Sequence, residues 1–87
     1  MSRPIAPTVH LNGTGRAQLV EPLQAAARAL RAAIAAVEDA APNARDYYPQ
    51  GPGAFERARS EHVARLARLQ AVLGELSAVW ESIEGVS

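Results

Sequence analysis

An acidic residue, an imidazole and a guanidinium lie within five positions at Glu61, His62 and Arg65. On a helix this spacing brings the groups near enough for acid–base chemistry or for part of a metal site. However, His62 has no His or Asp partner three or four residues further along, and the one other histidine, His10, belongs to the distant N-terminal segment. We therefore predict no metal site and no catalytic residue. His62 is interpreted as a half-buried residue that bonds to a carbonyl, or to its twin in a second copy, where it would specify the pairing.

The stretch PNARDYYPQGPG, residues 42–53, has a composition unlike the rest of the chain. Prolines and glycines here predict tight turns, and tyrosines are enriched where proteins bind one another. Two interpretations remain open: the tyrosines close the end of a helical hairpin, or they bind a partner. The two are compatible if one tyrosine points inward and the other outward. The candidate partner-binding residues are Arg45, Asp46, Tyr47, Tyr48 and Gln50.

A second candidate surface consists of arginines in the first half of the second predicted helix. Its members are Arg57, Arg59, Arg65 and Arg68. A basic helix face is typical of phosphate contacts, so a small nucleic-acid-binding regulator is the alternative function. Glu56 and Glu61 interrupt the cluster, and nine Asp and Glu residues balance nine arginines over the whole chain. Nucleic acid is therefore not the expected partner.

Several function classes are excluded by what the sequence lacks. No Gly-rich loop follows a strand, so nucleotide-binding loops are not expected, and no nucleophile has a base within evident reach. The absence of cysteine excludes disulfides and thiolate chemistry. No apolar run approaches the roughly 20 residues of a membrane span. We expect a cytoplasmic protein that is not an enzyme and uses no cofactor.

The elements that hold these residues are predicted to be helices. Pro4 and Pro7 favour extended backbone, so residues 1–13 are expected to form an N-terminal arm. Thr14 is a suitable N-cap for a first helix over about residues 15–41. Pro22 either kinks this helix or lies in the first turn of a main helix that begins there. The apolar seam of the helix has unbroken heptad spacing: Val20, Leu23, Ala27, Leu30, Ile34, Val37 and Ala41.

A loop over residues 42–53 and a second helix over about residues 54–84 complete the predicted hairpin of residues 14–87. Gly85 is expected to end this helix. Its seam contains Phe55, Arg59, His62, Leu66, Leu69, Leu73, Leu76, Trp80 and Ile83. The short connection predicts an antiparallel pair in which Val20 lies near Leu76 and Ile34 near His62. The fold class is therefore all-α.

Apolar residues also lie outside the seam that one pair of helices can bury. They are Leu19 in the first helix, and Val63, Val72, Val79 and Val86 in the second. Burial of each would stabilise the fold by roughly 1.5–3 kcal/mol, which favours a homodimer or higher oligomer that forms a four-helix bundle. The predicted dimer interface comprises Leu19, Val63, Val72, Val79 and His62. Alternatively, the arm folds back over the seam near Trp80 and Ile83.

Three fragments of the chain, VHLNGT at residues 9–14, PNxRDYYPQG at 42–51 and EHxxR at 61–65, occur together. In these fragments the chain resembles a group of small helical proteins encoded in bacteriophage and prophage genomes. The resemblance covers the arm, the loop and the start of the second helix. It implies no catalytic residue, and it implies an accessory or virion-associated role. Taken with the hairpin, it makes a non-enzymatic protein-interaction or assembly module the expected function.

Overall fold

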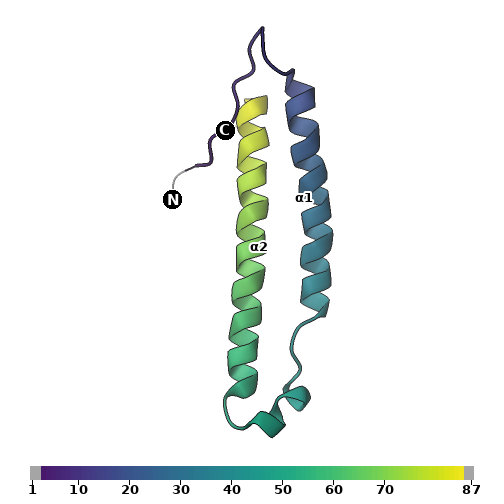
Figure 1. The fold of residues 1–87 in the computed structure, drawn as a ribbon, viewed down its shortest axis with the longest axis vertical. Coiled ribbons are helices and arrows are strands. Elements are labelled where there is room, and N and C mark those ends of the chain that lie inside the picture. Colours follow the sequence, from purple (N-terminus) through teal and green to yellow (C-terminus); the bar gives the residue numbers. More distant parts are fainter. Residues whose placement is uncertain (1–2, 86–87) are drawn as a thin grey trace.

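The computed structural model describes residues 3–85, which form two long antiparallel helices joined by a compact loop (Figure 1). Helix α1 spans Arg16–Asp39 and helix α2 spans Ala54–Glu84. Two single-turn 3-10 helices lie between them, η1 at Ala44–Asp46 and η2 at Tyr48–Gln50. No strand occurs within residues 3–85. The predicted all-α hairpin is confirmed, with α2 at the predicted bounds and α1 shorter than predicted.

The ends of the helices follow local backbone chemistry. Gly15, rather than the expected Thr14, is the N-cap of α1, and the side-chain oxygen of Gln18 accepts a hydrogen bond from the Gly15 N–H at 3.2 Å. Gly85 ends α2 in a left-handed conformation with φ of 78°, as predicted. At that end its N–H bonds to the carbonyl oxygen of Ser82 at 3.3 Å.

Helix α1 continues without interruption through Pro22. The alternative in which the main helix begins at Pro22 is therefore wrong, because six helical residues precede it. Pro22 is exposed, so water can reach the Gln18 carbonyl that has lost its usual N–H donor. Val20 remains buried in register with the residues beyond the proline.

The two helices bury a single narrow seam. Its apolar buried residues are Val20, Ala27, Ile34, Ala54 and Ile83, and His62 is buried among them. The remaining predicted seam residues are half-buried, with two exceptions: Ala41 and Arg59 are exposed. Ala58 takes the inward position expected for Arg59, because a guanidinium is costly to bury without a partner. No large side chain among the described residues is fully buried, so the core is thin.

The N-terminal arm runs back beside the last turns of α2, on the side away from α1 (Figure 1). Pro4 and Ala6 are half-buried, and the five consecutive residues Leu76–Trp80 are all half-buried. A helix with one neighbour alternates between covered and exposed positions, so this part of α2 is covered on two sides. The arm thus supplies part of the cover that the sequence offered as an alternative to a dimer. Val86 lies outside the described residues.

The hairpin is a rod with principal extents of 63, 25 and 18 Å. Its radius of gyration is 18.5 Å, whereas a compact domain of this length has about 12 Å. None of the described helices combines the length and apolar character that a bilayer crossing requires. The loop and the open end of the hairpin therefore lie at opposite ends of a long, thin molecule.

Candidate protein-interaction site in the interhelical loop

The loop between the helices is held in one shape by its own hydrogen bonds. The Asn43 side-chain oxygen accepts a bond from the Arg45 N–H at 3.1 Å and caps η1. In η2, the N–H of Gln50 bonds to the Tyr47 carbonyl at 2.9 Å, and that of Gly51 bonds to the Tyr48 carbonyl at 3.1 Å. Two consecutive 3-10 turns leave little of the loop without local support. Such preorganisation lowers the entropy lost when a partner binds.

Two glycines turn the chain from η2 into α2. Gly51 has φ of 100° and ψ of 175°, a region that is accessible almost only to glycine. Gly53 has φ of 85° and ψ of −10°, which is the left-handed helical region. These conformations direct the chain into α2, whose first residue is Ala54. The glycines therefore determine where the tyrosines of the loop stand relative to the helices.

The two adjacent tyrosines have different environments. Tyr47 is half-buried, and its ring packs against Phe55 with centroids 6.4 Å apart and planes inclined by 53°. This tilted arrangement is a favourable aromatic geometry. Tyr48 is 78% exposed. One tyrosine thus anchors the loop on α2 while the other is displayed, which is the mixed arrangement that the sequence left open.

The other predicted partner-binding residues lie within three positions of Tyr48 in the same loop. Arg45, Asp46 and Gln50 are all exposed. Together with Tyr48 they present an aromatic ring, a cation, an anion and an amide on one end of the rod. We call these four residues the display loop. Tyr47 supports this surface rather than forming its exposed part.

No known protein-family model matches the chain, and neither a curated protein nor a solved structure is significantly similar to it.

The predicted dimer-interface residues do not lie on one face. Val63 and Val72 are nine residues apart, which places them on opposite sides of α2 at 100° per residue. Val79 is seven residues from Val72 and shares its side. Val63 and Val72 are both exposed, and Leu19 and Val79 are half-buried. His62 is only 8% exposed and lies within the hairpin, so a partner would reach it only at its edge.

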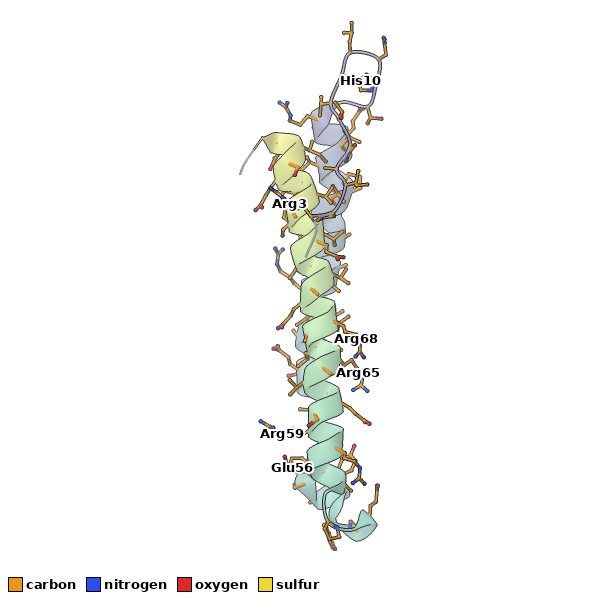
Figure 2. The ribbon with its side chains drawn as sticks, turned by 90° about the vertical axis from the view of Figure 1, so that its left-hand side faces the viewer. Arg3, His10, Glu56, Arg59, Arg65 and Arg68 are labelled. Atoms are coloured by element: carbon orange, nitrogen blue, oxygen red, sulfur yellow. The ribbon has the colours of Figure 1, made fainter. Side chains whose placement is uncertain are left out.

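The arginines of α2 are divided between two sides of the helix. Figure 2 shows Arg65 and Arg68 projecting to one side, while Arg59 lies towards the other. By helical geometry Arg57 shares the side of Arg65 and Arg68, but Glu61 lies in the middle of that side. A carboxylate at this position reduces the local positive potential. The basic surface is therefore smaller than the sequence order suggests.

Two open grooves lie on the surface of the hairpin, and sequence reasoning found neither. One, of about 490 Å³, lies at the open end between the helices and is lined by Arg16, Ala17, Val20, Glu21, Gln24 and Glu84. The other, of about 360 Å³, lies near the start of α2 and is lined by Glu56, Arg57, Ser60 and Glu61. Within residues 3–85, no group of three or more His, Cys, Asp or Glu side chains is placed to hold a metal ion. The first groove has no hydroxyl among its lining residues, and the second has Ser60 together with two carboxylates.

Proposed function

We propose that this protein is a non-enzymatic interaction or assembly module that recognises a protein partner through its display loop. The observation that carries the proposal is the contrast within the Tyr47–Tyr48 pair. Tyr48 is 78% exposed at the end of the rod, whereas Tyr47 packs on Phe55. An exposed aromatic ring on a preorganised loop is a typical anchor of a protein interface.

The polar neighbours of Tyr48 support recognition of a protein surface of mixed polarity. Arg45 can form paired hydrogen bonds with a carboxylate, and Asp46 and Gln50 can bind backbone or side-chain donors. These side chains are exposed and close to Tyr48 in the sequence, and polar residues of this kind form the rims of interfaces. The partner of this proposal is therefore a folded protein or an extended peptide with hydrogen-bonding groups beside an apolar depression.

The proposal includes a homodimer, in which two hairpins form a four-helix bundle and carry two display loops. The thin core and the exposed Val72 support a second copy. Two loops on one particle would increase avidity for a symmetric or repeated target. The resemblance to phage-encoded helical proteins extends the same proposal to an accessory or virion-associated role in assembly.

A nucleic-acid-binding regulator is the alternative, and Arg65 and Arg68 would carry it because they project together (Figure 2). The two functions differ in their dependence on salt. Phosphate contacts weaken steeply as salt concentration rises, whereas a contact centred on an aromatic ring weakens little.

The test is an affinity pull-down from the source cells with the wild-type chain, Tyr48→Ala and Gln70→Ala. Gln70 is exposed and lies in the middle of α2, so Gln70→Ala serves as the matched control. We expect a protein partner that wild type and Gln70→Ala retain at high salt and that Tyr48→Ala loses. Equal recovery by Tyr48→Ala, or capture of nucleic acid that Arg65→Ala/Arg68→Ala abolishes, would overturn the proposal.

A further inference from the structure

Two valines on one side of α2, the exposed Val72 and the half-buried Val79, border a row of mostly small residues on α1. Val72 and Val79 directly precede the seam residues Leu73 and Trp80, as Leu19 and Ala26 directly precede the buried Val20 and Ala27. In an antiparallel pair of heptad helices, residues at these equivalent positions lie on the same side of the seam. We call this surface the valine flank, and it comprises Leu19, Ala26, Ala33, Val72 and Val79.

The opposite side of the seam is more polar. The groove at the open end brings Ala17 and Gln24 of α1 together with Glu84 of α2, and it lies on that side. Further along the same side, α1 has Arg31 and α2 has Gln70. The two sides differ most on α1, where Leu19, Ala26 and Ala33 contrast with Gln24 and Arg31. On α2 the valine flank also carries Arg65, and the opposite side carries Val63 at 53% exposed.

The chain exposes more surface than a compact protein of the same mass. The accessible surface is 6397 Å². A compact monomer of 9.2 kDa exposes about 4,900 Å², so the excess is about 1,500 Å². A standard protein–protein interface buries about 800 Å² on each partner. The excess of the whole chain is larger than the area that a standard interface buries on one partner, so pairing two such rods would bring each closer to the exposed surface of a compact protein.

Side-chain sizes on the flank favour one arrangement of the two copies. The flank residues of α2 are valines, and Val72 is 44% exposed, whereas the flank residues of α1 are mostly alanines with smaller side chains. A two-fold axis parallel to the rods places the large row of each copy over the small row of the other. An axis perpendicular to the rods would instead place alanine on alanine and valine on valine. Large residues facing small ones fill space at the density of a protein interior.

We propose that two copies pair through the valine flank about a two-fold axis parallel to the rods. Val72 and Val79 of one copy then lie against Ala26 and Leu19 of the other. Arg65, seven residues before Val72, lies along the alanines with its charged head in water. Both display loops lie at the same end of the bundle, so the dimer binds its partner bivalently. This inference rests on the homodimer of the proposed function. It adds which surface the two copies share and which way the two rods point relative to each other.

Oligomeric state tests the surface. Sedimentation at micromolar concentration should give twice the 9.2 kDa mass for wild type. Val72→Glu and Ala33→Glu should weaken self-association at least about tenfold, while Val63→Glu, on the opposite side of α2, should leave it unchanged. Circular dichroism confirms that each variant remains helical. If Val63→Glu dissociates the dimer and Val72→Glu does not, the surface is wrong although the homodimer stands.

The distance between two spin labels tests which way the two rods point relative to each other. The chain has no cysteine, so Gln50→Cys introduces one spin-label site in each display loop. Loops at the same end should place the labels roughly 20–30 Å apart, whereas loops at opposite ends would place them on the order of 50 Å apart. The longer distance would overturn the parallel axis. A wild-type monomer would overturn both this inference and the homodimer, while recognition by Tyr48 would still be decided by the pull-down.

Discussion

The Nε atom of Arg16 donates a hydrogen bond to the carbonyl oxygen of Ile83 at 3.1 Å, across the open end of the hairpin. Arg16 is the first residue of α1, and Ile83 lies in the last turn of α2, where carbonyls have no partner within the helix. The cation also lies at the negative end of the α2 dipole. This one contact joins the beginning of the first helix to the end of the second.

Loss of the Arg16 contact should loosen the open end of the hairpin. We expect Arg16→Met, which keeps the aliphatic stem, to lower the free energy of unfolding by about 1 kcal/mol. Urea denaturation followed by circular dichroism measures the change. Arg28→Met is the control, since Arg28 is exposed in the middle of α1 and its loss should cost less than about 0.5 kcal/mol. Equal losses in the two variants would show that the Ile83 contact contributes nothing specific.

The sequence predicted the helical hairpin because the heptad seam of α1 and α2 follows from side-chain periodicity alone. The predicted register, with Val20 beside Leu76, places Arg16 beside Trp80. The Arg16 side chain reaches the carbonyl oxygen of Ile83, three residues further along α2. The Arg16 bond itself was not accessible, because several arginines are equally free to extend towards a backbone oxygen. Side-chain periodicity therefore predicts the fold, but it does not predict the individual polar contacts.

The sequence predicted which segment forms the candidate site, but not which of its tyrosines is buried and which is exposed. Composition identified the loop, yet only the backbone geometry set by Asn43, Gly51 and Gly53 decides which tyrosine faces Phe55. The position of the arm was left open for the same reason, since nothing in its periodicity directs it to one side of α2. Conformations of this kind depend on tertiary contacts rather than on local spacing.

The two tyrosines should separate stability from recognition. Tyr47→Ala removes the ring that packs on Phe55 and should lower the free energy of unfolding by about 1–2 kcal/mol. Tyr48→Ala should change it by less than about 0.5 kcal/mol, because the side chain is displayed in solvent. Thermal and urea denaturation of both variants measure this difference. A large destabilisation by Tyr48→Ala would assign that ring a structural role and remove the basis for recognition.

The two loop glycines should differ in what can replace them. Asparagine tolerates the left-handed helical region of Gly53, so Gly53→Asn should cost less than about 1 kcal/mol. At φ of 100° and ψ of 175°, Gly51→Asn should cost about 1–3 kcal/mol. Denaturation of the two variants side by side provides the comparison. If Gly51→Asn is the better tolerated, the path of the chain between η2 and α2 differs from the one described.

Gly74 lies inside α2, and a methyl group added there would meet no atom within 4 Å apart from its chain neighbours and the backbone of its own helix. Close approach of another backbone within the same chain therefore does not explain this glycine. Gly74→Ala should raise the free energy of unfolding by about 1 kcal/mol, because alanine has the higher helix propensity. Its side of α2 faces away from Val72, so self-association should be unchanged. A fall in stability or a change in mass would show that another copy approaches Gly74.

His62 is 8% exposed and occupies a seam position, and the next two seam residues, Leu66 and Leu69, are leucines. No buried side-chain nitrogen or oxygen among the described residues lacks a partner, so the imidazole is accommodated without an orphaned polar atom. His62→Leu should raise the free energy of unfolding by roughly 0.5–1 kcal/mol, since it replaces a polar group with an apolar one inside the seam. His62→Asp should lower it by at least about 2 kcal/mol, because a carboxylate would be buried without a cation. Urea denaturation measures both, and sedimentation should give the His62→Leu variant the mass of wild type. A changed mass would instead assign His62 the role of a polar contact that selects the pairing of two copies.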